Sequence, residues 1–179
     1  AQVSEALVLM ASAKTAMAEF VSVKGVFAQA DDGSGTIAAG LPICKNKHGD
    51  DAGHNAGCNR TYGLPNANDI GGKYVANVRT NSDNTDTGVG IIIALFGEYG
   101  CGGSAACSQM KIGGGRRNIF PYAIAHEKLS KGALLLTGTD RGGSISWVCS
   151  SACPGDYCNT TYNLDSDAPD ITAYLPSSC

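Results

Sequence analysis

Eight cysteines constrain the fold of this 179-residue chain more than any other feature of its sequence. An even number of cysteines in a chain that also holds 24 glycines predicts disulfides formed in an oxidising compartment. The chain contains no C-x-x-C pair, which argues against a thioredoxin-like redox motif and against a zinc ribbon. All eight are therefore expected to form disulfides: Cys44, Cys58, Cys101, Cys107, Cys149, Cys153, Cys158 and Cys179.

One group of cysteines and histidines has two interpretations. Cys44, His48, His54 and Cys58 follow the pattern C-x3-H-x5-H-x3-C, and all four side chains are able to bind zinc. The alternative is a disulfide between Cys44 and Cys58 that closes a polar loop. We favour the disulfide, because this spacing matches no common zinc finger and thiols in an oxidising compartment usually become disulfides. No metal site is therefore predicted.

Residues 1–24 carry the clearest helical pattern. Apolar side chains recur at helical spacing and form one packing stripe: Val3, Leu7, Met10, Met17 and Val21, widened by Ala6, Ala13 and Phe20. Alanine is frequent, and neither proline nor glycine occurs before Gly25, which is expected to end the helix. The stripe is already in phase at the first residues and no capping residue precedes them, so the helix is expected to continue upstream of Ala1.

The remainder of the chain alternates between irregular segments and strands. Residues 31–69 are rich in Gly, Asn, Asp and Pro and predict a long loop, and Ile119–Lys131 fits either a short strand or a short helix. Alternating or β-branched apolar residues predict four strands, the first of them half-buried: Lys73–Thr80, Thr87–Phe96, Leu134–Thr139 and Ser144–Cys149. The glycines in Gly138–Gly143 predict a hairpin turn between the last two. This order indicates an α+β fold, with the long N-terminal helix packed on one face of a roughly four-stranded antiparallel sheet, in one domain, 1–179.

Composition and motifs argue against several functional classes. The net charge of -3 provides no basic field for strong nucleic-acid binding by one chain. We identify no apolar stretch of the ~20 residues that a membrane span needs, and we interpret the chain as soluble. G-x-S-x-G, H-E-x-x-H and P-loop motifs are absent from the sequence, so neither a catalytic residue nor a cofactor is predicted.

Four weaker motifs receive structural interpretations. We expect His126 and Glu127 to be an exposed pair rather than an acid–base dyad, and the segment Gly113–Arg117 to be a flexible hinge rather than a phosphate cradle. The segment Asn81–Asp86 lacks the closing Glu of a calcium loop, which favours a turn. Asn59-Arg60-Thr61 and Asn159-Thr160-Thr161 fit the N-glycosylation pattern, to which we give little weight.

Three stretches of the chain resemble one known family. Ala1–Ala6 (AQVSEA), Gly72–Val75 (GKYV) and the pair Trp147–Cys149 (WVC) and Leu175–Cys179 (LPSSC) resemble segments of type IVa pilins. The resemblance implies the type IV pilin fold, with 1–24 as the C-terminal half of the long helix. It also implies an αβ-loop at 31–69, a sheet region at 72–149 and a disulfide-bounded D-region at 149–179. The apolar first half of the family's helix is absent, so the chain looks like an N-terminally truncated soluble form.

The resemblance also implies how the cysteines pair. WVC and LPSSC correspond to the ends of the pilin D-region, which implies a Cys149–Cys179 disulfide. Nearest-neighbour pairing then predicts Cys44–Cys58, Cys101–Cys107 and Cys153–Cys158, because short loops close at the smallest entropy cost. These additional cysteines depart from the family's single bridge. The family's signature glutamate lies in the absent part, so Glu5 does not take over its role.

As a type IVa pilin, the chain is expected to be the major subunit of an extracellular pilus, used for surface attachment, twitching motility and DNA uptake. The expected partners are further copies of itself, the inner-membrane assembly machinery and a host receptor or glycan. Membrane contact is expected only through the missing helix half, which carries a methylated N-terminus in the full-length protein. The alternatives are a minor pilin, a type II secretion pseudopilin, and a secreted binding module or small hydrolase.

Overall fold

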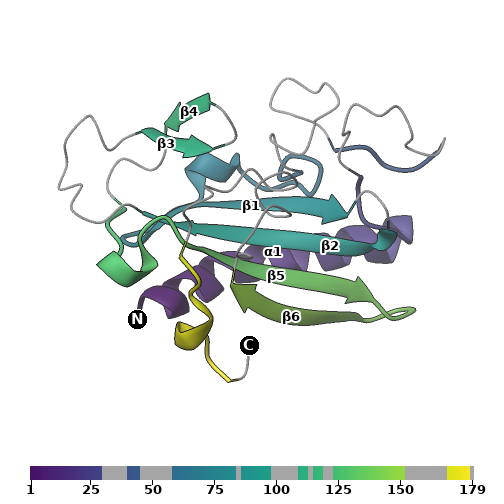
Figure 1. Cartoon of the computed structure of the whole chain (residues 1–179). Helices are drawn as coiled ribbons and strands as arrows, with labels where there is room; N and C mark the ends of the chain where they lie inside the picture. Colours follow the sequence, from purple (N-terminus) through teal and green to yellow (C-terminus); the bar gives the residue numbers. More distant parts are fainter. Residues whose placement is uncertain are drawn as a thin grey trace.

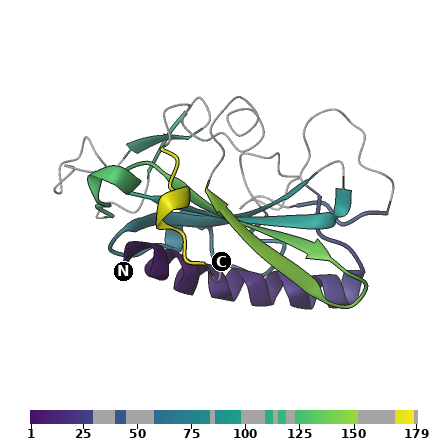
Figure 2. The same cartoon turned by 60° about the horizontal axis from the view of Figure 1, so that its bottom comes forward.

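One long helix and a four-stranded antiparallel sheet form the framework of the computed structural model (Figure 1). The structure describes residues 1–29, 40–44, 58–83, 86–97, 109–112, 115–118, 123–151 and 169–177. The helix lies along one face of the sheet, as the second view shows (Figure 2). The predicted α+β arrangement is thereby confirmed.

Helix α1 spans Gln2–Lys24 and packs through a stripe of side chains that recurs at steps of four and three: Ala6, Met10, Ala13, Met17 and Val21. Met10, Met17 and Val21 belong to the predicted stripe, whereas Val3 and Leu7 are only partly buried and pack at the margin of the core. The stripe is centred on Ala6 and Ala13, whose small side chains let the helix approach the sheet closely. As predicted, the helix ends at Gly25, which adopts φ 77° and donates its N–H to the Val21 carbonyl at 2.7 Å.

The sheet has the order β1-β2-β5-β6, and all neighbouring strands are antiparallel. Its strands are β1 (Val75–Asp83), β2 (Asp86–Phe96), β5 (Ala133–Asp140) and β6 (Ile145–Ser151). All four predicted strands are present. Asp83 pairs with Asp86 at the adjoining ends of β1 and β2, and Asn84 and Thr85 of the predicted Asn81–Asp86 turn lie outside the described residues. Gly142 and Gly143 have φ of 75° and 111° between β5 and β6, which confirms the predicted hairpin turn.

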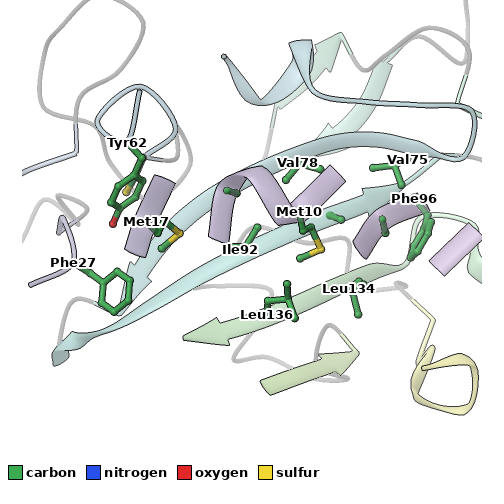
Figure 3. Close-up of a cluster of buried hydrophobic side chains, with 14 of the residues drawn as sticks. Met10, Met17, Phe27, Tyr62, Val75, Val78, Ile92, Phe96, Leu134 and Leu136 are labelled. Atoms are coloured by element: carbon green, nitrogen blue, oxygen red, sulfur yellow. The ribbon is translucent and has the colours of Figure 1, made fainter. Parts of the chain in front are cut away.

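The main core lies between α1 and the sheet. In Figure 3 the side chains of Met10 and Met17 lie between the helix and sheet residues such as Ile92. Phe27 and Tyr62 extend this cluster at the Met17 end, and Phe96 lies at the other end. The apolar stripe of the helix therefore packs against every second residue of the central strands.

Strands β1, β2 and β5 are also buried on the face of the sheet that points away from α1. Ile93 on β2 belongs to a second apolar cluster there, and the polar residues Asn77, Arg79 and Asn81 on β1 are each less than a tenth exposed. The prediction that β1 is half-buried is therefore wrong. Its alternating sequence reflects an apolar face toward the helix and a polar face that is buried as well.

Five short elements lie outside the helix and the four-stranded sheet in the described structure. Strands β3 (Gln109–Ile112) and β4 (Gly115–Asn118) pair antiparallel and lie on the other side of the sheet from α1 (Figure 2). The predicted hinge at Gly113–Arg117 is wrong in this respect, because Gly115, Arg116 and Arg117 belong to a paired strand. Within Ile119–Lys131, the described part contains a 3-10 turn, η3 (Glu127–Leu129). Two similar turns are η1 (Ala67–Asp69) and η4 (Thr172–Tyr174).

Candidate assembly surface and stapled loops

The outer face of α1 is exposed and almost uncharged along most of its length. Val8 is 73% exposed and Val23 is 78% exposed. The hydroxyls of Ser12 and Thr15 donate to helix carbonyls one turn earlier, at 3.2 and 3.3 Å, and Ser22 does the same at 2.7 Å. Because the helix itself accepts these hydroxyl protons, the face presents few polar groups that need water. A second apolar surface is therefore able to pack on it at little desolvation cost.

The two charged side chains in the first sixteen residues of α1 interact with the sheet region. The Glu5 carboxylate accepts hydrogen bonds from the backbone N–H groups of Tyr74 and Val75, at 2.8 and 3.1 Å. The Lys14 ammonium lies 5.6 Å from the centre of the Trp147 ring on β6, which is within cation–π distance. Both charges thus connect the helix to the sheet region.

Helix α1 is long and apolar enough to cross a membrane, judged by length and composition alone. Our interpretation that no stretch of the chain meets this test is therefore wrong. Ala, Ser and Thr interrupt the strongly apolar residues of α1 without making the segment polar, so no uninterrupted apolar run marks it in the sequence. The same composition also suits a helix that packs on a sheet through one face, which is how α1 is placed here.

The loop after α1 is fixed by a disulfide between Cys44 and Cys58, whose Cα atoms lie 4.8 Å apart. This bond agrees with the favoured interpretation of the C-x3-H-x5-H-x3-C pattern and leaves neither sulfur as a zinc ligand. His48 and His54 lie outside the described residues. Within the described part of the chain, no group of His, Cys, Asp and Glu side chains is arranged to hold a metal ion.

Asn59, directly after the disulfide, attaches the loop to the open edge of β1. Its side-chain N–H groups donate to the carbonyls of Val78 and Pro65, and its side-chain oxygen accepts from the N–H and hydroxyl of Thr80. Cys58 N–H donates to the Thr80 carbonyl at 2.8 Å. Asn59 is only 4% exposed, so it is not a glycan acceptor in the folded protein, although it heads an N-glycosylation pattern. Asn159 lies outside the described residues.

Tyr62 lies in the same loop and is buried. Its ring meets Phe20 of α1 edge-on, with 5.0 Å between ring centres, and its oxygen accepts the Ala28 N–H at 3.0 Å. Burial raises the pKa of the Tyr62 phenol well above its usual value, because the phenolate would be desolvated. The protonated ring is therefore part of the folded state.

This burial predicts a loss of stability in alkali. A tyrosine in the unfolded chain ionises at pH ~10, whereas folded Tyr62 keeps its proton. The stability that the buried Tyr62 phenol contributes is therefore complete below pH ~10 and is lost as the pH rises above it. Tyr62→Phe leaves the buried Ala28 N–H without its acceptor and should cost about 1–2 kcal/mol at pH 8. The difference in unfolding free energy between wild type and Tyr62→Phe, measured by urea titration, should shrink between pH 8 and pH 10.5. A constant difference would contradict the prediction.

The chain after β6 returns to the sheet. Cys149 on β6 is disulfide-bonded, and its partner lies outside the described residues, as do Cys101, Cys107, Cys153, Cys158 and Cys179. Ile171 is fully buried in the main core and donates its N–H to the Ser151 hydroxyl at 2.9 Å. Hydrogen bonds from Thr172 hold the pKa of exposed Asp170 below its usual value. Ile171 therefore anchors the last described segment.

The other motifs singled out in the sequence have structural positions. His126 is exposed and caps η3, where its ring nitrogen Nδ1 accepts the Lys128 N–H at 3.3 Å. Gln2 on α1 accepts the His126 N–H at 3.0 Å. These contacts agree with the interpretation of His126 and Glu127 as an exposed pair.

A family model for pilin, a bacterial filament protein, matches residues 1–117. The chain belongs to the pilin family. The matched region contains α1, the Cys44–Cys58 disulfide and strands β1 and β2, which all contribute residues to the main core. No curated protein matches the chain. The helix-on-sheet architecture agrees with the type IV pilin fold, and a pilin is a structural subunit of a surface filament.

Proposed function

We propose that this pilin is the major subunit of a type IVa pilus and assembles through the outer face of α1. The observation that carries this proposal is the exposed, uncharged surface around Val8, on which Ser12 and Thr15 are already hydrogen-bonded within the helix. A helix of this kind packs favourably against apolar surfaces of neighbouring copies. Repetition of one heterologous contact that does not close produces a helical filament.

The finer roles are part of the same proposal. Subunits anchored in the inner membrane before assembly, and then displayed outside the cell as a filament, would serve surface attachment, twitching motility and DNA uptake. The Cys149–Cys179 bridge would close the D-region that the filament exposes. Catalysis is not part of the proposed role.

The assembly surface is tested by introducing a charge on α1. Val8→Lys in the full-length gene, expressed in a pilus-null bacterium, should reduce the number of surface fibres by tenfold or more. The free-energy cost of burying an unpaired ammonium in the filament exceeds ~1.4 kcal/mol, which corresponds to a factor of about ten. Val148→Lys is the matched control, since Val148 is an exposed valine (58%) on β6. Fibres are counted by electron microscopy.

The outcomes of this experiment separate the alternatives. Abundant fibres from Val8→Lys would contradict assembly through this face, provided that both variants accumulate to the wild-type level. Absence of fibres from the wild-type gene, with the protein present in the membrane, would contradict a major subunit and favour a minor pilin.

A further inference from the structure

We propose that the Cys44–Cys58 disulfide must be made before the 58–65 loop docks on β1, and that the docked loop then shields the bond from thiols. Oxidation of the Cys44 and Cys58 thiols would thus come first, and docking of the 58–65 loop second. This order is independent of how the protein assembles.

Burial is the first observation. Cys44 and Cys58 are both 0% exposed and belong to the main core cluster together with Phe27 and Tyr62. A thiol or disulfide reagent reacts only by bringing its own sulfur into contact with a protein sulfur. With both cysteines 0% exposed, neither sulfur is accessible for that approach in the described structure.

The backbone on both sides of the disulfide is fixed as well. Cys44 N–H donates to the Gln29 carbonyl at 2.8 Å, and Cys58 N–H donates to the Thr80 carbonyl at the same distance. Asn59 adds hydrogen bonds to Val78 and Thr80 on the outer edge of β1. Movement of Cys58 away from β1 therefore breaks these bonds, and this movement is the opening that we propose exposes the sulfurs.

The chemistry is thiol–disulfide exchange with an external disulfide, either that of a thiol-oxidising protein or oxidised glutathione. The thiolate of one cysteine attacks the oxidant's disulfide and forms a mixed disulfide, releasing one oxidant thiolate. The thiolate of the second cysteine then displaces the remaining oxidant sulfur. The two protein thiols lose two electrons and two protons, and the oxidant disulfide becomes two thiols. Both attacks need accessible sulfurs, which places them before docking.

Native-state reduction tests the shielding. The oxidised protein is treated with dithiothreitol, quenched with an alkylating reagent and analysed by mass spectrometry, so that molecules labelled only at Cys44 and Cys58 are counted. Their rate of appearance should be at least ~100-fold lower in buffer than in guanidinium chloride, because reduction waits for the loop to open. Asn59→Ala should raise the native rate by about tenfold or more, and Asn66→Ala should leave it unchanged. Asn66 is the matched control because it directly follows this loop and, among the described residues, its side chain hydrogen-bonds only exposed Asp69.

Two results would overturn the proposal. One is labelling of Cys44 and Cys58 in native buffer at the rate seen in guanidinium chloride, with all other cysteines still bridged. The other comes from refolding the reduced chain and adding oxidised glutathione only after Tyr62 is buried. The proposal is overturned if Cys44–Cys58 then forms as fast as it does when the glutathione is present from the start. If Tyr62 stays exposed until the bond forms, oxidation precedes docking as proposed.

Discussion

Asn59→Ala is expected to lower the free energy of unfolding by about 3 kcal/mol, which corresponds to a fall of about 6–12 °C in Tm for a domain of this size. The substitution leaves the Thr80 N–H and the Val78 carbonyl on the edge of β1 without partners, and both residues are fully buried. Each orphaned buried group costs about 1–3 kcal/mol. Guanidinium titration of the oxidised protein, followed by circular dichroism, measures the change.

Asn59→Asp tests whether the two donated hydrogen bonds are the cause. The carboxylate keeps the acceptor for Thr80 but places a second oxygen against the carbonyls of Pro65 and Val78. Burial should raise the pKa of this new carboxyl above its unfolded value of ~3.9, so the variant loses stability relative to wild type as pH rises from 4 to 7. Asn66→Ala should change stability by less than about 0.5 kcal/mol at either pH. Equal effects at Asn59 and Asn66 would show that the loop is not anchored through Asn59.

The local features of the fold were predictable because they depend on local patterns. The end of α1 follows from Gly25, and the positions of β2 and β5 follow from runs of β-branched and leucine residues. The hairpin formed by β3 and β4 was missed, because its sequence has few β-branched residues and its triple glycine suggested a hinge. The packing stripe is centred on Ala6 and Ala13 rather than on Val3 and Leu7, because small side chains let the helix approach the sheet most closely.

The role of Asn59 was not predictable, since its partners lie about twenty residues away and no local pattern marks them. The only signal was an asparagine directly after a cysteine in a loop too long to be unsupported, and the glycosylation pattern suggested the opposite, an exposed side chain. Contacts between distant segments become visible only when the strand edge and the loop are both placed.

The first two stretches that resemble pilins, Ala1–Ala6 and Gly72–Val75, contact each other in the folded chain. Glu5, in the helix, binds the backbone N–H groups of Tyr74 and Val75, which belong to the Gly72–Val75 stretch. A Cβ atom on Gly72 would lie 2.5 Å from the Glu5 carboxylate oxygen, so glycine is needed for this approach. No local pattern in the sequence marks this role of Glu5, because its partners lie about seventy residues away. The structure shows that Glu5 connects the start of the helix to the start of β1.

Gly97→Ala is expected to be as damaging as Asn59→Ala, with a loss of about 3 kcal/mol in unfolding free energy, at the upper end of the usual effect of overpacking. A Cβ at Gly97 would overlap the backbone carbonyl of Ala123. Neither backbone is free to retreat, because Gly97 N–H donates to the Tyr74 carbonyl at 2.8 Å while Ile124 N–H donates to the Lys73 carbonyl at 2.9 Å. The clash therefore has to separate three segments that meet at the end of β2.

The matched control for Gly97→Ala is another glycine associated with the same strand. A Cβ at Gly88 in β2 would lie 3.2 Å from the side-chain oxygen of exposed Asp86, which is able to move away, and Gly88→Ala should change stability by less than about 0.5 kcal/mol. Both variants are compared with wild type by guanidinium titration at pH 7. If the two alanine variants unfold at the same denaturant concentration, the close approach of Gly97 to Ala123 does not limit the fold. If only Gly97→Ala is displaced, the sheet end beyond Phe96 tolerates no side chain, a constraint that comes from three backbone segments and that no pattern in the sequence marks.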